Sequence, residues 1–125
     1  MVSGLGIDLV EVGRIEKIIE KWGDRFTRRV FSDDENSYCR NRFNSSEHYA
    51  VRFAAKEAFL KCVGLGIGRG ISLNQIEVTL DNRGKPLLRV HAEANESLSG
   101  IQDENIHISL THTKEYASAV VILER

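Results

Sequence analysis

Two carboxylates and a lysine stand at positions where they could do chemistry. Asp8 follows apolar residues at the start of the chain, and α/β proteins commonly place metal-binding carboxylates at strand ends. Glu57 and Lys61 are four residues apart in an apolar, alanine-rich segment, so they share a face if that segment is helical. A charged pair on a largely buried helix is costly unless something compensates it. Structural roles stay open as well, with Asp8 as a turn-former or helix cap and Glu57 and Lys61 as a surface ion pair.

Arginine and histidine residues supply further candidates. Arg52 lies in the same alanine-rich segment, about 140° around the helix from Glu57. His112 lies between two threonines at the predicted end of a strand, where a histidine is either structural or functional. The remaining histidines are His48, His91 and His107. The four histidines together do not have the spacing of metal ligands.

A basic group lies in the first third of the chain. Arg25, Arg28 and Arg29 follow an amphipathic segment that already carries Arg14. Such a basic face is either solvated or docks an acidic partner. The formal net charge of the whole chain is −1, which gives no indication of a nucleic-acid or membrane partner.

Composition places the chain among folded, cytoplasmic proteins. Its 125 residues are expected to form a single domain, 1–125, and 42% hydrophobic content is typical of globular proteins. Cys39 and Cys62 have neither zinc spacing nor a disulfide framework, which indicates free thiols in a reducing cytoplasm. No apolar run approaches the roughly 18 residues of a membrane span, and residues 1–4 lack the features of a signal peptide.

Segments in the first half must position most of these residues. Glycine alternates with apolar residues over 2–10, which predicts a strand, and these glycines do not form a phosphate-binding fingerprint. Apolar residues at helical spacing predict a helix over 11–22 that ends at Gly23. The same periodicity assigns Ile18 and Trp22 to the core before any contact role.

Two capping patterns predict the next helices. Ser32 followed by Glu35 is a capping box that should open a short helix. Asn44 followed by Glu47 is a similar cap, and the helix that it opens should run to about residue 63. Glycines then break the chain into a loop over 64–70.

The second half of the chain is predicted to be mostly strands. A hairpin is expected from 76–80 and 86–90, joined by a turn over 81–84. Residues 92–98 could form a short helix. Two further strands are expected over 107–111 and 117–123, joined by the turn-like residues 112–115. Helices in the first half and strands in the second indicate the α+β class.

Taken together, four motifs resemble the holo-acyl-carrier-protein synthases, the small class of phosphopantetheinyl transferases. They appear in family order over almost the whole chain: Gly6-Ile7-Asp8 with Arg14, then 52–58 (RFAAKEA) with Lys61, then Gly84-Lys85-Pro86, and finally 109–117 (SLTHTKEYA). Any one motif is weak, whereas four in order are specific. The resemblance implies the phosphopantetheinyl transferase fold, with helices packed on a small, mainly antiparallel sheet.

The resemblance also implies a reaction. Coenzyme A and apo acyl carrier protein would give holo acyl carrier protein and adenosine 3′,5′-bisphosphate, through attack of a carrier serine on the β-phosphorus. Asp8 and Glu57 would hold Mg²⁺, which accepts hard oxygen ligands and keeps several waters. Lys61 would stabilise charge on the leaving phosphate. The serine proton would pass to Glu57 or to a metal-bound water.

Nucleotide binding, docking and assembly are implied in the same way. The residues that match the family's coenzyme A site are Arg52, Lys61, Gly84, Lys85, Pro86, His112 and Thr113, with His112 expected to meet the 3′-phosphate. The expected docking surface for the acidic carrier protein is Arg14, Arg25 and Arg28. A one-lobed chain of this class is expected to form a homotrimer with active sites at subunit interfaces.

Two positions depart from the pattern of the larger relatives in the family. Phe53 stands where they often carry tryptophan, an exchange that concerns packing. Val10 stands where they place a second acid, and Glu11 has the wrong spacing to replace it. The metal is therefore expected to have fewer protein carboxylates and more water.

Two other functions remain open from the sequence. The chain could modify carrier domains of polyketide or peptide synthetases instead of the fatty-acid carrier. It could also be a non-enzymatic module whose arginine-rich segment binds an acidic protein or nucleic acid, with Glu57 and Lys61 as a plain ion pair.

Overall fold

The computed structural model describes residues 1–64, 71–91, 98 and 101–125. Its helices and strands run in the order β1 (Val2–Glu11), α1 (Val12–Trp22), α2 (Asp24–Val30), α3 (Asp33–Arg40), α4 (Ser45–Cys62), β2 (Ile76–Leu80), β3 (Pro86–Val90), β4 (Ile106–His112) and β5 (Tyr116–Glu124). Short 3-10 helices precede β2 (Leu73–Gln75) and β4 (Asp103–Asn105).

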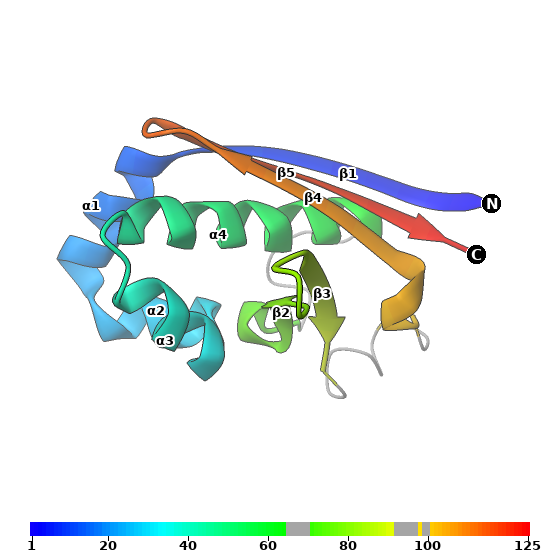
Figure 1. Ribbon diagram of the computed structural model, residues 1–125, viewed down its shortest axis with the longest axis horizontal. Coiled ribbons are helices and arrows are strands. Elements are labelled where there is room, and N and C mark those ends of the chain that lie inside the picture. Colours follow the sequence, from blue (N-terminus) through cyan, green and yellow to red (C-terminus); the bar gives the residue numbers. More distant parts are fainter. Residues whose placement is uncertain (65–70, 92–97, 99–100) are drawn as a thin grey trace.

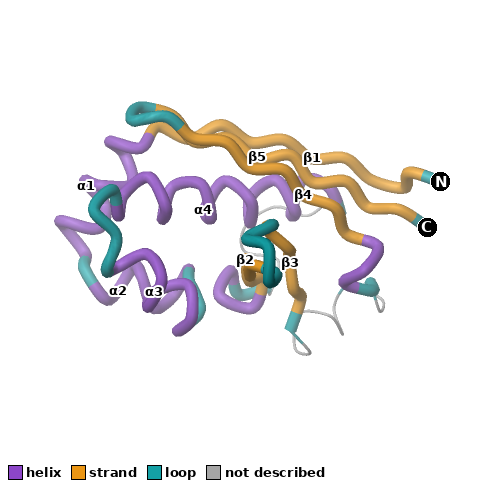
Figure 2. Tube along the Cα trace, viewed as in Figure 1, coloured by secondary structure: helices purple, strands orange, loops and turns teal. Residues whose placement is uncertain are grey.

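The strands form two antiparallel sheets on different sides of α4. β1, β5 and β4 make a three-stranded sheet in that order, so the first and last strands of the chain are neighbours. β2 and β3 form a separate hairpin. In Figures 1 and 2 the three-stranded sheet covers one side of α4, while the hairpin, α2 and α3 lie on the other. This arrangement confirms the predicted α+β class.

Glycines allow β1 to lie directly on α4. A Cβ at Gly6 would stand 1.9 Å from the Ala58 carbonyl oxygen, and one at Gly4 would stand 2.5 Å from the Cys62 carbonyl oxygen. No larger side chain fits between the two backbones at these positions. Because residues alternate faces along a strand, Asp8 lies on the same helix-facing side as Gly6.

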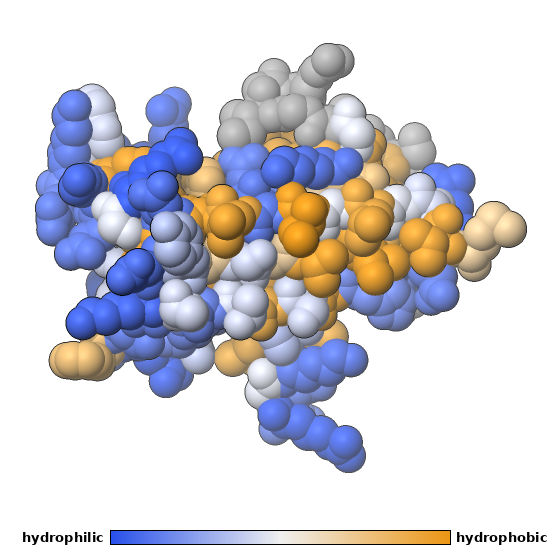
Figure 3. Space-filling view, turned by 90° about the horizontal axis from the view of Figure 1, so that it is seen from above, coloured by the Kyte–Doolittle hydropathy of each residue, from blue (hydrophilic) through white to orange (hydrophobic). Residues whose placement is uncertain are grey.

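The opposite face of β1 is apolar and exposed. Leu5, Ile7 and Leu9 are 64%, 63% and 67% accessible to solvent. Across the strand pairing, Leu5 faces Ile122 and Ile7 faces Val120, so the apolar strip continues onto β5. Viewed from the sheet side, Figure 3 shows apolar side chains gathered in a band along the middle of this face.

α4 is buried on most of its circumference, as its alanine and aromatic content predicts. Lys56 is fully buried, and its Nζ donates to Glu35 Oε1 at 2.7 Å and to the carbonyl oxygens of Leu73 and Ile76. Burial lowers the pKa of Lys56, while the neighbouring Glu35 carboxylate opposes that effect. This ion pair, which no local sequence pattern predicts, joins α4 to α3 and β2.

Most predicted elements are confirmed within a residue or two. The Ser32–Glu35 capping box has both of its hydrogen bonds, and α1 ends at Gly23 as predicted. The missed element is α2, which carries the arginine-rich segment. The helix predicted over 92–98 and the glycine loop over 65–70 lie outside the described residues, except for Leu98.

Two local expectations were wrong. Asn44 occupies the N-cap position of α4, but its side chain makes no capping hydrogen bond, and Glu47 points elsewhere. Trp22 was assigned to the core but is 48% exposed, because α1 packs through Val12 and Ile15 and leaves its C-terminal end at the surface. Among the helices that the structure describes, none is long and apolar enough to cross a membrane.

Candidate active site

Asp8 and Lys61 meet where β1 lies on α4. The Lys61 Nζ donates to Asp8 Oδ1 at 3.0 Å and to the Ile7 carbonyl oxygen at 3.1 Å. The Asp8 side chain is 15% exposed, whereas that of Lys61 is 57% exposed. The close β1–α4 contact described above brings residue 8 beside the last turns of the helix. The predicted Glu57–Lys61 surface pair is therefore replaced by an ion pair between Lys61 and Asp8.

Glu57 lies beside this pair and is half-buried. It makes no hydrogen bond or ion pair to any residue that the structure describes. Its pKa is raised above the ordinary 4.5, chiefly by burial and then by the Asp8 carboxylate, while Lys61 and Arg14 act in the opposite direction. Two carboxylates, a lysine and an arginine thus converge at the β1–α4 contact.

The carboxylates at this contact suit a hard cation. Asp8 and Glu57 are close enough for the charge of one to raise the pKa of the other, and a cation between them would relieve that repulsion. Mg²⁺ commonly takes one or two protein carboxylates and fills its other positions with water or phosphate oxygens. Over the described ranges no group of three or more acidic, histidine or cysteine side chains has metal-binding geometry, so a site here would rest on this pair.

A second group of charged side chains surrounds Tyr38. The guanidinium carbon of Arg42 lies 4.0 Å from the centre of the Tyr38 ring, and that of Arg52 lies 4.4 Å from it. The His48 ring contacts Tyr38 with ring centres 5.5 Å apart and His112 with ring centres 5.3 Å apart. We call these four basic side chains and Tyr38 the cationic cluster.

Arg52 is the buried member of the cationic cluster. Only 5% of it is exposed, and its Nη1 donates to the His48 carbonyl oxygen at 3.2 Å. Its buried Nε has no hydrogen-bond acceptor in the part of the chain that the structure describes. Burial, followed by the charges of Arg52 and His112, lowers the pKa of His48. The cluster therefore has an excess of positive charge and an unsatisfied donor, which an anion would compensate.

Glu47 provides the acidic partner of this cluster. Its Oε1 lies 2.9 Å from His112 Nδ1, and both side chains are partly buried. The bond ties the first turn of α4 to the last residue of β4. This contact explains why Glu47 does not complete the predicted cap. Sequence reasoning took Glu47 for a helix-capping residue, and no local signal pairs it with His112.

The remaining predicted nucleotide residues lie at turns. Gly84 has φ of 80°, which allows the tight β2–β3 turn, and Asp81 closes that turn by accepting from the Lys85 backbone amide. Lys85 is exposed at the tip and Pro86 begins β3. Thr113 closes the β4–β5 turn, where its Oγ1 accepts from the Tyr116 amide at 3.1 Å.

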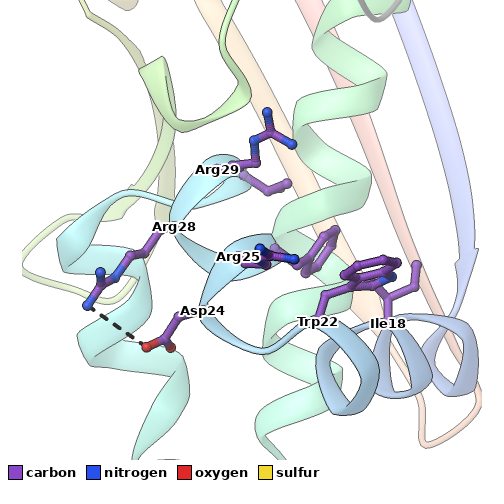
Figure 4. A pocket seen from close by; sticks show the side chains of 8 residues that line it. Ile18, Trp22, Asp24, Arg25, Arg28 and Arg29 are labelled. Carbon is purple, nitrogen blue, oxygen red and sulfur yellow. Dashed lines mark ion pairs between the residues drawn. The ribbon is translucent and has the colours of Figure 1, made fainter.

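The arginine-rich segment lines an open groove between α1 and α2. Its volume is about 950 Å³, and its walls include Ile18, Trp22, Phe26 and the three arginines of α2. Figure 4 shows Ile18 and Trp22 side by side on α1 with Arg25 near them, while Arg28 extends away to an ion pair with Asp24. That pair is 3.9 Å long and exposed. The groove combines an apolar floor with basic side chains at its rim.

Within one chain, the predicted site residues fall into separate groups. Asp8 and His112 lie on β1 and β4, the two edges of the three-stranded sheet. His48 and Glu57 are nine residues apart, so at about 100° per residue they lie on opposite sides of α4. Figure 1 places the β2–β3 hairpin on the far side of α4 from β1. The structure brings Asp8, Glu57, Lys61 and Arg14 together, and Arg52 with His112, but does not join these groups.

A comparison with protein families and curated proteins matches nearly the whole chain. The family model of the 4′-phosphopantetheinyl transferase superfamily matches residues 4–121. The chain is 50% identical over 124 residues to a holo-[acyl-carrier-protein] synthase of Syntrophus aciditrophicus (strain SB), which covers 99% of this chain and 97% of that protein.

Solved structures have the same fold. The holo-[acyl-carrier-protein] synthase (AcpS) of Neisseria meningitidis superposes with a TM-score of 0.88 at 31% identity, over 100% of both chains. The holo-(acyl-carrier-protein) synthase of Bacillus anthracis str. Ames, in complex with CoA (3′,5′-ADP), superposes with a TM-score of 0.79 at 38% identity, over 99% of this chain and 97% of that one.

Proposed function

Since the chain belongs to the 4′-phosphopantetheinyl transferase superfamily, we propose that it moves the phosphopantetheine arm of coenzyme A onto a serine of apo acyl carrier protein. The products are holo acyl carrier protein and adenosine 3′,5′-bisphosphate. The observation that carries this function is the convergence of Asp8, Glu57 and Lys61 at the β1–α4 contact. The proposal treats 1–125 as one catalytic domain of the cytoplasm, where free thiols such as Cys39 stay reduced.

In the reaction, the carrier serine oxygen forms a bond to the β-phosphorus of coenzyme A. The bond from that phosphorus to the bridging oxygen breaks, and adenosine 3′,5′-bisphosphate leaves. Lys61, more than half exposed at the end of α4, neutralises charge on the leaving phosphate. The serine proton passes to the Glu57 carboxylate or to water at the site. Phosphoryl transition states are loose, so positioning and charge neutralisation dominate.

Asp8 and Glu57 would hold Mg²⁺ in this proposal. A divalent cation held by these two carboxylates would supply positive charge against the pyrophosphate of coenzyme A. The position two residues after Asp8 on the same strand holds the buried, apolar Val10, so the site has no third carboxylate from this strand. Lys61 already donates to Asp8, and the same flexible side chain can turn toward a bound phosphate.

The cationic cluster binds the 3′-phosphate of coenzyme A. Its excess positive charge and the unsatisfied Nε of buried Arg52 support this role. Phosphate contacts from arginine and histidine are charge-assisted and therefore stronger than neutral hydrogen bonds. Gly84, Lys85 and Pro86 at the exposed hairpin tip, with Thr113 in the neighbouring turn, would frame the rest of the nucleotide.

A second copy of the chain completes the site. The pyrophosphate and 3′-phosphate of coenzyme A are separated by one ribose, whereas Glu57 and the cationic cluster are separated by the width of α4, about 10–12 Å with side chains. One ligand cannot span both groups within a single chain. We therefore infer that the β1 edge of one copy faces the cationic cluster of the next, in a homotrimer.

The exposed apolar face of the sheet supports this assembly. Leu5, Ile7 and Leu9 form a contiguous strip with Val120 and Ile122, and such strips on soluble proteins commonly mark interfaces. A second copy of the chain is the occupant we propose. The strip lies on the same strand as Asp8, so an interface here brings a neighbour to the candidate active site.

The carrier protein docks on the groove between α1 and α2. Arg14 is close enough to Glu57 to lower its pKa, so it can guide an acidic partner directly to the catalytic group. Arg25 and Arg28 extend the basic rim away from that point. Trp22, half-exposed on the groove, offers the apolar contact that interface hot spots commonly use.

The direct test incubates the purified chain with apo acyl carrier protein, coenzyme A and Mg²⁺. We expect the carrier protein to gain the mass of the phosphopantetheine arm, and EDTA to prevent the gain. Asp8→Asn should abolish transfer while the protein remains folded, because one of the two metal-binding carboxylates is lost. Full modification of the carrier by Asp8→Asn, or no modification by the wild type, would refute the proposed function.

A further inference from the structure

Glu47 occupies a position that the proposed reaction does not itself explain. It lies in the first turn of α4, at the edge of the cationic cluster, and its carboxylate meets His112 Nδ1 at 2.9 Å. A carboxylate beside a phosphate site is unfavourable unless it acts on another group. It meets His112 of the cationic cluster, and the charged residues Lys114 and Glu16 line the same small cavity as Glu47.

The hydrogen bond determines which nitrogen of His112 is free. Because Nδ1 faces Glu47, only Nε2 remains for a ligand, and it has no hydrogen-bond partner among the residues that the structure describes. For Nε2 to donate to a phosphate while Nδ1 donates to Glu47, the ring must be the imidazolium. A carboxylate at Nδ1 balances that charge, whereas an uncharged group would not.

We propose that Glu47 is a positioning residue that makes the site selective for the 3′-phosphate of coenzyme A. It holds the His112 ring with Nδ1 toward the Glu47 carboxylate and Nε2 available to a ligand, next to His48 in the cationic cluster. This inference rests on the proposed function, because it assigns a role within the same nucleotide site. It predicts discrimination between coenzyme A and 3′-dephospho-coenzyme A.

The structure offers a matched control for the Glu47–His112 pair. His107 and Glu124 form a second histidine–carboxylate contact at 3.0 Å, also joined to β4. That pair is exposed and lies at the other end of β4 from His112. If both pairs were purely structural, Glu47→Gln and Glu124→Gln would change the selectivity for coenzyme A over 3′-dephospho-coenzyme A to a similar extent.

The test measures kcat/KM for coenzyme A and for 3′-dephospho-coenzyme A with the full chain and apo acyl carrier protein. Glu47→Gln should reduce the ratio of the two values about tenfold, through KM for coenzyme A, because a charge-assisted contact is lost. Glu124→Gln should leave the ratio at the wild-type value. His112→Ala should lose the same selectivity, and adding Glu47→Gln to it should cause little further loss.

A binding measurement distinguishes failure of the Glu47 positioning role from failure of the proposed transfer reaction. Affinities for adenosine 3′,5′-bisphosphate and for adenosine 5′-monophosphate should show the same loss of selectivity in Glu47→Gln, even if that variant turns over poorly. Equal losses for both ligands, or an unchanged ratio, would overturn the positioning role while wild-type transfer still supports the proposed function. Absence of wild-type transfer would instead remove the proposed function and this inference with it.

Discussion

At the scale of single residues, the candidate site is marked by a partly buried carboxylate that has no described partner to compensate its loss of hydration. Glu57 is half-buried, has no described hydrogen-bond partner and lies near the Asp8 carboxylate. Lys56, the preceding residue, is fully buried but paired with Glu35. Adjacent positions on one helix thus differ in whether the buried charge has a partner, and Glu57 is the one that we propose binds a ligand.

Glu57 should destabilise the metal-free protein at neutral pH. Its folded pKa is raised above 4.5, so its stabilising contribution is complete below that pH and is lost as pH rises through the raised pKa. Glu57→Gln should therefore melt above wild type at neutral pH while it abolishes transfer. Thermal melts at decreasing pH should show the difference shrinking toward pH 4.5. A variant that melts below wild type at neutral pH would contradict this account.

Lys56 and Lys61 should differ strongly although both belong to α4. Lys56→Met leaves the Glu35 carboxylate buried without its cation, which should cost about 3–5 kcal/mol of unfolding free energy. Lys61→Met removes an ion pair whose lysine is more than half exposed, and it should cost about 1 kcal/mol while it impairs turnover. Urea denaturation of the two variants gives the comparison. Equal unfolding free energies would mean that the Lys56–Glu35 pair does not hold α3 and β2 to α4.

At the scale of elements, the close contact of β1 with α4 places Asp8 beside Lys61, two of the residues that we propose to be catalytic. Gly6→Ala would put a Cβ 1.9 Å from the Ala58 carbonyl oxygen, so the strand must move away from the helix. We expect a loss of about 3 kcal/mol or more in stability, together with loss of transfer because Asp8 moves. Unfolding and transfer assays on the purified variant measure both.

Gly13→Ala is the control for that substitution. Gly13 lies in α1 with nothing within 4 Å of a Cβ, so alanine there should stabilise the protein by about 0.5–1 kcal/mol. A tolerated Gly6→Ala with normal transfer would show that the β1–α4 distance does not control the site.

Elements with local signals could be predicted from the sequence. The Ser32–Glu35 capping box, the stop at Gly23 and the β2–β3 turn each depend on residues within a few positions of one another. The glycine alternation in β1 predicted a strand but not its orientation, because the pattern does not say which face meets a helix. The glycine face turned out to be the packed one.

Contacts between distant residues could not be predicted in this way. The Lys56–Glu35 and Glu47–His112 pairs join residues 21 and 65 positions apart, and no periodicity relates such positions. Residue spacing left Asp8 and Lys61 as separate candidates, and the family resemblance implied one site for both; their direct ion pair follows from the strand–helix packing. The catalytic and binding roles of these residues remain predictions, whereas their geometry is now described.

At the scale of the whole molecule, we propose that the two halves of the site belong to different copies of the chain. The apolar strip on β1 and β5 provides a surface for that contact, and Asp8 lies on the same strand. The groove between α1 and α2, which is the proposed docking surface, is lined by none of the residues of the strip.

Subunit complementation tests this central claim most directly. Asp8→Asn removes the metal half of a site and His112→Ala weakens the nucleotide half, so each variant alone should transfer little at coenzyme A concentrations well below KM. When the two variants are co-expressed in equal amounts and assemble at random, about one quarter of the sites combine an intact metal half with an intact nucleotide half. We predict that the mixed protein, confirmed as trimeric by its mass in solution, recovers about a quarter of the wild-type rate. A rate no greater than the average of the two separate variants would show that each chain works alone and would contradict the account.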